Sequence, residues 1–521
     1  MGIMQQAVKS KYLAGIDIGT TGAKAIVFDL TGAPLASAYN EYPCTYPRPN
    51  WVEQDANLVV EATMKSAAEA IRKSGVAPAD IASVSISAQR CCGIFLDEKG
   101  AMLRPMISWQ DNRTPAEVKE IASRVDQRQY YRTTGFPNST TWLLSKMMWV
   151  RKNEPEVWKR TRRIVQMHDY FLRALGVEDY YVDMNDAGFF GCYDTIGFKW
   201  DDGLLKTFDI PREILPVPEA SGTVVGKVSR EAAARSGFAP GTPIAIGAGD
   251  QSAGSLGAGV TRSGLVSISM GTAGAVNAFL AEPFRDPHGR IMVTNHTIKG
   301  RWLLEGYQAA AAGVYRWFRD ELAALEKAFA GATGKDPFDL INEEAAAVPA
   351  GSRGLVFLPY LASAATPRYN SDARGVLAGL TFAHTRGCLA RAFMEGITLD
   401  MMDMIQAMVK AGVTVEKVRI LGGPTRSQLW NQIQADVYGR PVQTLKIPDA
   451  TVLGAAILGG VGAGVFSSIE EGADRMVRVD KTYEPLAVNV KVYEELYRTY
   501  CRLYEALDSS GSFKAISALQ T

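Results

Sequence analysis

Runs of apolar residues alternate with polar segments along the first half of the chain, and their length and spacing predict its elements. Short runs rich in β-branched residues predict strands at 12–19, 22–30, 81–88 and 242–249. Apolar residues at helical spacing predict helices at 57–75, 145–160 and 168–176. This half is therefore predicted to be a set of strands with helices between them.

The second half repeats the alternation. Strands are expected within 264–280 and at 417–424. Helices are expected at 311–330, 389–412, 429–439, 451–466 and 489–507. Strands that alternate with helices are typical of the α/β class. Because 521 residues exceed what one hydrophobic core holds, we expect two domains, 1–256 and 257–521.

An internal similarity relates the two halves. When Ile16 is aligned with Ile268, "IDIGTTGAKA" lies over "ISMGTAGAVN", and five of the ten positions are identical. Both copies read as a strand, a Gly-Thr-x-Gly turn and a second strand. The offset is about half the chain, so we interpret the two copies as equivalent hairpins of two related domains.

Turns built of glycine and threonine are suited to binding phosphate groups. Small residues let backbone N–H groups approach an anion closely, and threonine hydroxyls add donors. Asp17 occurs only in the first copy, where the second has Ser269. A carboxylate beside phosphates commonly holds Mg²⁺, directly or through water. The alternative for a single hairpin is an ordinary tight turn. The two copies together favour a phosphate site.

Composition excludes several classes of protein. The chain is 47% hydrophobic and 21% charged, and its net charge is +1. This balance indicates neither a nucleic-acid partner nor a disordered chain. No apolar run is long enough to span a membrane. The six cysteines form no zinc or disulfide pattern, so we expect a reduced cytoplasmic protein. Neither a P-loop nor a dinucleotide-binding glycine pattern is present.

Motifs along nearly the whole chain, from Tyr12 to about Leu507, resemble those of the FGGY-family carbohydrate kinases. The matching segments occur in family order; they include "GIDIGTTGAKAIVFD", "NWVEQDA", "SWQDNR", "IGAGDQSAGSLGAG", "ISMGTAG", "ILGGPTRSQLWNQIQADVYGRPV" and "ATVLGAAILGG". The resemblance implies two ribonuclease-H-like domains of the actin-like ATPase type, with ATP and a sugar bound in a cleft between them.

Carried onto this sequence, the resemblance implies specific site residues. The ATP-binding residues would be Gly19, Thr20, Thr21, Lys24, Gly271, Thr272, Gly313, Arg316, Gly422, Gly423 and Ser427. Mg²⁺ would be held by Asp17 and Asp250, through water. Asp250 matches the catalytic base, because a carboxylate can take the proton of a weakly nucleophilic sugar hydroxyl as the γ-phosphoryl group arrives.

The segments that would bind the substrate differ in sequence from those of known family members. The implied substrate-binding residues are Gln89, Arg90, Trp109, Asp111, Thr141, Asp250 and Gln251. Xylulokinases have Gln-Met-His-Gly and glycerol kinases Gln-Arg-Glu where this chain has "QRCCG", so Cys91 replaces an acid. Cys91 and Cys92 are interpreted as small packing residues, because no neighbour in sequence would activate a thiolate. The segments "GVGAGVFSSIEEGADRMVR" and "YRWFRDEL" look most like bacterial autoinducer kinases.

Two classes of function follow. The first is a kinase that transfers phosphate from ATP to a small sugar or polyol, with a ketopentose favoured and an autoinducer or glycerol-type substrate as alternatives. The second is a conformational ATPase like actin or the heat-shock ATPases, which share these hairpins. "WVEQDA", "SWQDNR" and "GGPTRSQLW" favour the kinase. Expected partners are a small sugar or polyol, not nucleic acid or membrane, and a homodimer is left open.

Overall fold

The computed structural model describes residues 11–520 and divides the chain into two compact units. Unit 1 comprises Met1–Thr261, Leu280–Leu303 and Asp449–Arg478, and unit 2 comprises Arg262–Phe279, Leu304–Pro448 and Val479–Thr521. The units differ from a single division after residue 256, because two later segments belong to unit 1. One of them carries the predicted helix 451–466.

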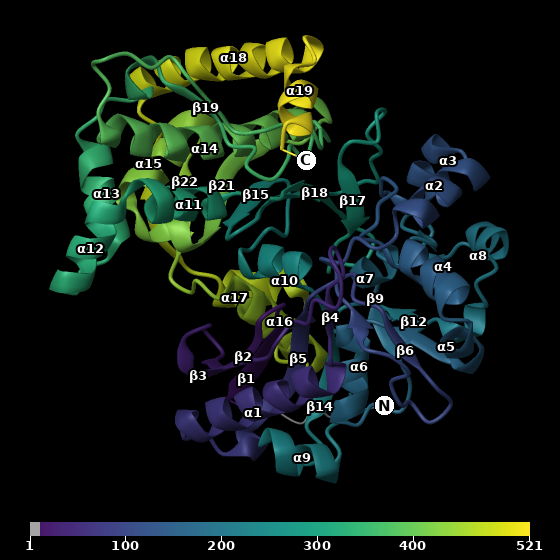
Figure 1. Cartoon of the computed structure of the whole chain (residues 1–521). Helices are drawn as coiled ribbons and strands as arrows, with labels where there is room; N and C mark the ends of the chain where they lie inside the picture. Colours follow the sequence, from purple (N-terminus) through teal and green to yellow (C-terminus); the bar gives the residue numbers. More distant parts are fainter. Residues whose placement is uncertain (1–10, 521) are drawn as a thin grey trace. The chain divides into compact units, whose positions relative to one another are not determined.

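Unit 1 is built on a sheet with the strand order β13-β14-β5-β1-β2-β3 (Figure 1). Its strands are β1 Tyr12–Ile18, β2 Gly22–Asp29, β3 Pro34–Glu41, β5 Ile81–Ala88, β13 Val224–Lys227 and β14 Pro243–Gly249. Its smaller strands are β4 Glu53–Gln54, β6 Ile94–Leu96, β7 Met106–Ile107, β8 Arg163–Val165, β9 Tyr181–Asp183, β10 Tyr193–Asp194, β11 Lys199–Trp200, β12 Val217–Glu219 and β17 Met292–Asn295.

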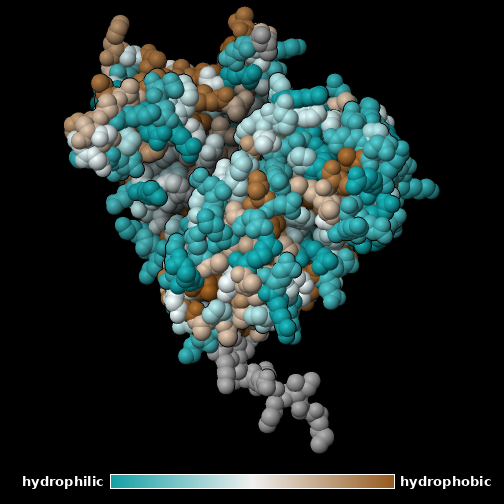
Figure 2. Space-filling view, turned by 60° about the horizontal axis from the view of Figure 1, so that its bottom comes forward, coloured by the Kyte–Doolittle hydropathy of each residue, from teal (hydrophilic) through white to brown (hydrophobic). Residues whose placement is uncertain are grey.

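The helices of unit 1 are α1 Ala56–Ser74, α2 Pro115–Arg124, α3 Gln127–Thr134, α4 Leu143–Asn153, α5 Pro155–Arg160, α6 Met167–Leu175, α7 Met184–Gly188, α8 Asp202–Phe208, α9 Arg230–Ser236, α10 Asp250–Gly257, α16 Ala450–Gly462 and α17 Ile469–Met476. Of these, α1, α6, α7, α10 and α16 contact the sheet. On the face that Figure 2 shows, hydrophilic side chains predominate and hydrophobic ones lie in small separate groups. No helix among the described residues combines the length and apolarity needed to cross a membrane.

The alternation of side chains along β1 decides which residues meet which helix. Ala14, Ile16 and Ile18 pack in one core cluster with residues of α1. Successive residues of a strand point to opposite faces, so Gly15 and Asp17 face the other side. There a Cβ on Gly15 would lie 2.2 Å from the Val452 carbonyl oxygen of α16. The small residue lets α16 approach β1, and Asp17 follows on the same face.

Glycines also explain how α16 packs on α10. A Cβ on Gly454 would lie 2.0 Å from the Ala253 oxygen, and one on Gly257 would lie 1.8 Å from the Ala450 oxygen. The two helices therefore contact each other backbone to backbone, which only glycine allows here. In Figure 1 the yellow-green α16 lies beside the purple β1 and the dark blue β5, and it packs on both.

Unit 2 contains a second sheet in which β18, β16, β15, β21, β22 and β23 lie side by side in that order. Its strands are β15 Gly264–Met270, β16 Gly274–Leu280, β18 Trp302–Gln308, β19 Val356–Leu358, β20 Val376–Ala378, β21 Val415–Gly422, β22 Val442–Leu445 and β23 Val479–Tyr483. Its helices are α11 Ala312–Leu322, α12 Ala324–Thr333, α13 Pro337–Ala346, α14 Arg386–Lys410, α15 Gln428–Tyr438, α18 Ala487–Ser509 and α19 Ser512–Ala518.

The internal similarity corresponds to a repeated topology. In unit 1, β1 pairs antiparallel with β2 and parallel with β5, and in unit 2, β15 pairs antiparallel with β16 and parallel with β21. The registers differ by one residue. Ile18 lies opposite Ala23, but Met270, its equivalent, lies opposite Gly274 rather than Ala275. The second turn is therefore the tighter one.

Two predicted helices are each divided in the structure. The segment 145–160 forms α4 and α5, which are separated at Glu154 because Pro155 cannot continue the hydrogen bonding of a helix interior and begins α5 instead. The segment 311–330 is interrupted at Ala323 between α11 and α12. The methionine-rich helix α14 belongs to the core, since Met394, Met401 and Met404 are all fully buried.

Candidate functional site

The first Gly-Thr turn presents its backbone N–H groups on one side. Its Gly19 carbonyl accepts a 2.5 Å hydrogen bond from the Tyr42 hydroxyl, and its Thr20 carbonyl accepts one of 2.8 Å from Gln54 Nε2. In a trans peptide the N–H points opposite to the C=O. The N–H groups of Thr20 and Thr21 therefore point away from Tyr42 and Gln54. This is the arrangement that an anion-binding turn needs.

Asp17 lies at the end of β1, beside this turn, in an acidic environment. Burial, followed by the neighbouring Asp250 carboxylate, raises the pKa of Asp17 from 3.8 to about 7. Asp449 raises it further and Lys24 opposes the shift. A nearby cation would stabilise the ionised form of such a buried carboxylate. The position of Asp17 therefore fits the predicted metal-side acid.

Lys24 faces Asp17 across the hairpin and pairs with an acid that the sequence analysis did not identify. Asp17 and Lys24 are directly opposite in the β1–β2 register. The Lys24 ammonium lies 2.5 Å from Oδ1 of Asp449, the residue that precedes α16, and both side chains remain about one third exposed. The predicted phosphate contact of Lys24 would therefore compete with this ion pair.

Asp250 lies where β14 ends and α10 begins, as the sequence predicts. Its Oδ1 atom is 3.0 Å from Nε of Arg90, and it also accepts the backbone N–H of Gln251 at 2.7 Å. The Asp250 side chain is 35% exposed, whereas that of Arg90 is 10% exposed. The Arg90 guanidinium also lies 4.3 Å from the centre of the Phe189 ring. A largely buried arginine thus holds an accessible carboxylate.

Gln89 and Trp109 connect the predicted sugar side to the first turn. Gln89 is buried and donates to Gln54, the residue that holds the Thr20 carbonyl. The indole Nε1 of Trp109 donates to Oγ1 of Thr20 at 2.8 Å. These contacts bring the predicted substrate residues Gln89, Arg90, Trp109 and Asp250 together with Asp17 and Thr20 in one unit.

Asp111 and Thr141 are placed differently. Asp111 is fully buried, and its carboxylate accepts hydrogen bonds from the Val52 amide, the Arg113 amide and the Arg113 guanidinium. Both oxygens are engaged by the chain itself, so Asp111 stabilises the loop that carries Trp109. Its predicted contact with the substrate stays a prediction. Thr141 is partly buried and bonds to Ser139.

The second turn, in unit 2, is held from α11. The Thr272 carbonyl accepts the N–H groups of Ala311 at 2.8 Å and of Gly313 at 3.3 Å. A Cβ on Gly313 would lie 2.9 Å from that same carbonyl oxygen. The absence of a side chain at Gly313 therefore lets α11 approach the turn, and its predicted contact with the nucleotide stays a prediction. Since the Thr272 carbonyl is held, the N–H of Ala273 points away from α11.

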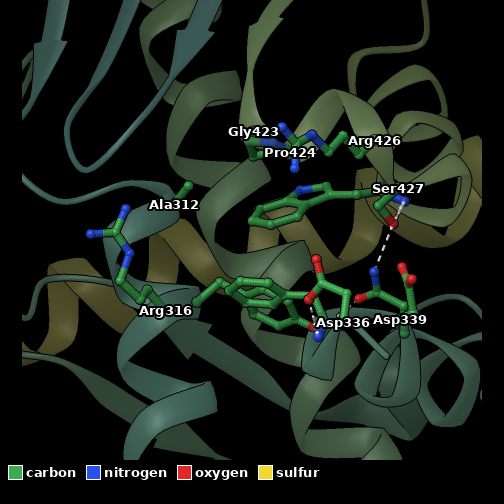
Figure 3. A pocket seen from close by; sticks show the side chains of 12 residues that line it. Ala312, Arg316, Asp336, Asp339, Gly423, Pro424, Arg426 and Ser427 are labelled. Atoms are coloured by element: carbon green, nitrogen blue, oxygen red, sulfur yellow. Dashed lines mark hydrogen bonds between the residues drawn. The ribbon is translucent and has the colours of Figure 1, made fainter. Parts of the chain in front are cut away.

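A cavity of about 410 Å³ in unit 2 is lined in part by Arg316, Gly423 and Ser427, three of the residues predicted on the nucleotide side. Figure 3 shows Gly423, Pro424 and Arg426 along one side of it, with Arg316 and Asp336 on the opposite side. The lining residues are Ala312, Tyr315, Arg316, Asp336, Phe338, Asp339, Asn342, Gly423, Pro424, Arg426, Ser427 and Trp430. Its volume is within the range typical of small-molecule sites.

Aromatic rings and a short hydrogen-bonded chain shape this cavity. Tyr315 and Phe338 are stacked with ring centres 5.7 Å apart, and Trp430 meets Tyr315 edge-on at 5.1 Å. The Tyr315 hydroxyl donates to Asn342, whose amide donates to Ser427 (Figure 3). Gly422, at the end of β21, has φ +96°, and a Cβ there would lie 2.2 Å from the Met270 carbonyl oxygen.

Mg²⁺ is the metal that the family resemblance implies. Among the described residues, no group of three or more His, Cys, Asp or Glu side chains is arranged to hold a metal ion. Asp17 nevertheless has a buried Oδ1 atom with no hydrogen-bond partner, and Asp250 raises its pKa. Two carboxylates fit a hydrated Mg²⁺ that takes most of its oxygen ligands from water and phosphate.

Two acids, one near Asp17 and one near Asp250, are absent from the residues that the sequence predicts for the site. Asp449 precedes α16 as an N-cap-type residue, a local signal that indicates a helix start but not its partner. Asp186 is fully buried in α7, and burial, followed by Asp183, raises its pKa well above the usual value. A Cβ on Gly249 would lie 2.3 Å from Oδ1 of Asp186 and 2.4 Å from Cδ of Arg90.

Comparisons with known proteins agree along most of the chain. The N-terminal domain model of the FGGY family of carbohydrate kinases matches residues 12–257, and the C-terminal domain model matches residues 266–463. A xylulose kinase of Bacillus subtilis (strain 168) is 30% identical over 500 residues, which cover 95% of this chain and 97% of that protein. A gluconokinase of the same strain is 29% identical over 501 residues, covering 96% and 97%.

A solved structure agrees with these matches. The crystal structure of the xylulose kinase from Rhodospirillum rubrum has a TM-score of 0.86 and 30% sequence identity, and the match covers 96% of this chain and 99% of that one. The two-domain α/β architecture is thus the actin-like ATPase fold of these kinases. With both family models matched in order and a relative aligned over nearly its full length, the chain belongs to the FGGY family of carbohydrate kinases.

Proposed function

We propose that this carbohydrate kinase transfers the γ-phosphoryl group of ATP to a hydroxyl of a ketopentose, with Asp250 as the general base. The observation that carries this proposal is the position of Asp250. It lies at the carboxyl end of a central strand, 35% exposed, with Nε of Arg90 at 3.0 Å. A base of this kind must reach the sugar hydroxyl within about 2.6–3.2 Å.

Arg90 has two functions in this proposal. Its guanidinium, with Nε at 3.0 Å from Oδ1, holds the Asp250 carboxylate in place. It also places donors beside the substrate, where a guanidinium can hydrogen-bond a carbonyl oxygen of a ketose. Trp109 supplies an apolar wall, and its bond to Thr20 connects that wall to the first turn.

The phosphates of ATP are assigned to the two turns. In each turn a carbonyl accepts a hydrogen bond, so the N–H of the next residue points to the opposite side. These N–H groups belong to Thr20 and Thr21 in unit 1 and to Ala273 in unit 2. The cavity in unit 2 is assigned to the adenosine end. The stacked Tyr315 and Phe338 rings offer an apolar lining there, and Asn342 and Ser427 offer polar groups.

Mg²⁺ is assigned to Asp17 and Asp250, through water. Bound there with ATP, the ion would neutralise charge on the phosphate oxygens. Asp17 contributes a fixed carboxylate for this purpose. Lys24, held by Asp449, adds a cation on the same hairpin.

Xylulose is the first candidate substrate, because a xylulose kinase aligns with this chain over nearly its full length. The "QRCCG" segment differs from xylulokinases, so the autoinducer and glycerol or erythritol alternatives are kept as outcomes of the test. The free thiols of all six cysteines fit a reducing compartment, and we propose the cytoplasm. A homodimer remains a prediction that light scattering can check.

A coupled ADP-release assay tests the proposal. The enzyme is given Mg·ATP with xylulose, ribulose, erythrulose, gluconate, glycerol, erythritol or the autoinducer precursor. The proposal predicts that a ketopentose raises ADP release well above the rate with ATP alone and gives the highest kcat/KM. Stimulation only by another compound would replace the ketopentose, and no stimulation by any of them would favour a conformational ATPase.

A further inference from the structure

A buried lysine joins the two loops that carry the predicted sugar-side residues. Lys146 lies in α4 and is fully buried. Its ammonium donates to the Cys91 carbonyl at 2.8 Å and to the Ser108 carbonyl at 2.8 Å. Burial lowers its pKa below the usual value. An amine is costly to bury unless its donors are satisfied, so these two carbonyls are what retain it.

The two carbonyls belong to residues next to the predicted substrate contacts. Cys91 follows Arg90, and Ser108 precedes Trp109. The same amine therefore fixes the backbone on which both side chains are mounted. Neither of these two loops is part of α4 itself, which supplies the amine from outside them.

The backbone at Cys91 is strained. Its φ is +62°, in the left-handed region that non-glycine residues rarely adopt. Such a conformation is unfavourable and persists only where the surroundings impose it. Here the Cys91 N–H donates to Gln166 Oε1 at 2.6 Å, while its carbonyl accepts from Lys146. Both sides of the residue are held by buried side chains.

The direction of Arg90 depends on this turn. Its guanidinium lies over Phe189 and its Nε contacts Asp250. A relaxed backbone at Cys91 would rotate the Arg90 side chain away from both. The matching change at Ser108 would loosen the indole of Trp109 from Thr20.

We propose that Lys146 is a positioning residue for the sugar, which it affects by holding the Cys91 and Ser108 carbonyls and thereby the direction of Arg90 and Trp109. The sugar-side assignment rests on the proposed function. The hydrogen bonds and the strained turn do not depend on which sugar is used.

The test compares Lys146→Met with Met147→Ala. Methionine keeps much of the volume but donates nothing. Met147 is the next residue of α4, is equally buried and packs in the neighbouring core cluster, so its truncation destabilises the fold without removing either hydrogen bond. Hydrogen exchange is measured on the full-length proteins without ligand. Lys146→Met should raise exchange at least fivefold in peptides covering 89–93 and 106–110, and Met147→Ala should not.

Kinetics supply the second readout. With the best substrate of the ADP-release assay, Lys146→Met should raise the KM for the sugar at least tenfold and leave the KM for ATP within twofold. Cys91→Gly in the Lys146→Met background should recover most of this loss, because glycine adopts φ +62° without strain.

Unchanged exchange in Lys146→Met would overturn the proposal, as would equal effects from Met147→Ala. A rise in both KM values together, with no recovery by Cys91→Gly, would show only general destabilisation and would also overturn it. If no sugar stimulates the wild-type enzyme, the proposed function fails while the exchange comparison still decides the role of Lys146 in the two loops.

Discussion

Nε of Arg90 lies 3.0 Å from Oδ1 of Asp250, although Arg90 follows β5 and Asp250 begins α10. The pair forms because β14 lies beside β5 in the sheet and both strands run in the same direction. Their carboxyl ends therefore meet at one edge. The proposed catalytic site depends on this edge of the sheet, because the base follows one strand and its cationic partner follows the other.

Arg90→Met should lower kcat/KM for the sugar by two to three orders of magnitude. The substitution removes both the cation beside Asp250 and the donors proposed for the substrate, while methionine retains much of the contact with Phe189. Steady-state kinetics at saturating ATP measure the change. Arg90→Lys, which keeps the charge but not the planar donor set, should fall between the two enzymes. Wild-type kinetics in Arg90→Met would remove Arg90 from the site.

Asp17→Asn should abolish transfer yet stabilise the metal-free protein, increasingly so as the pH rises. The folded-state pKa of about 7 lies above the unfolded value of 3.8, so the folded state binds the proton more tightly. Ionised Asp17 thus costs stability as the pH rises from about 4 to 7. Asparagine avoids this cost, and we expect a gain of about 1–2 kcal/mol at pH 5 and about 4 kcal/mol at pH 8.

Asp29→Asn provides the control for this pH dependence. Although burial opposes the shift, hydrogen bonds from Thr31 lower the pKa of Asp29 below its usual value. Its ionised form therefore stabilises the fold above pH 4, and the asparagine variant should lose stability there. Denaturant unfolding of all three proteins at pH 5 and pH 8, with EDTA present, gives the comparison. A flat pH profile for the Asp17→Asn gain would mean that Asp17 titrates normally.

Gly422→Ala should weaken ATP binding about tenfold. Its Cβ would lie 2.2 Å from the Met270 carbonyl oxygen, at the end of the strand that leads into the second turn, so β15 must shift. Gly412→Ala is the matched control, because Gly412 also has a positive φ, +91°, but a Cβ there meets nothing within 4 Å. Calorimetric titration with Mg·ATP measures both. Equal losses in the two variants would point to backbone strain alone.

The sequence was sufficient to predict the two hairpins and the place of Asp250, because both depend on local pattern. Gly19, Gly22, Gly271 and Gly274 mark the turns, and an apolar strand leads directly to Asp250. The pairing of Lys24 with Asp449 could not be predicted, since the two residues are 425 positions apart. The hydrogen bonds of the Asp111 carboxylate with Val52 and Arg113 could not be predicted for a related reason, because only the fold brings Val52 to it.

The packing partner of the helix 451–466 could not be predicted from the sequence either. Its glycines indicate close packing, but the partner is decided by contact of Gly454 with Ala253 and of Val452 with Gly15. A division of the sequence into two consecutive halves therefore assigns it to the second domain, whereas its contacts assign it to unit 1.

The most direct test of the account is the turnover of Asp250→Asn, measured as sugar-dependent ADP release together with ATP affinity and thermal stability. Asparagine keeps the shape of the side chain but cannot accept the proton of the sugar hydroxyl. The account predicts that kcat falls by at least two orders of magnitude, while the melting temperature and the Kd for Mg·ATP remain close to the wild-type values. A kcat within threefold of the wild-type enzyme would contradict the assignment of Asp250 as the base.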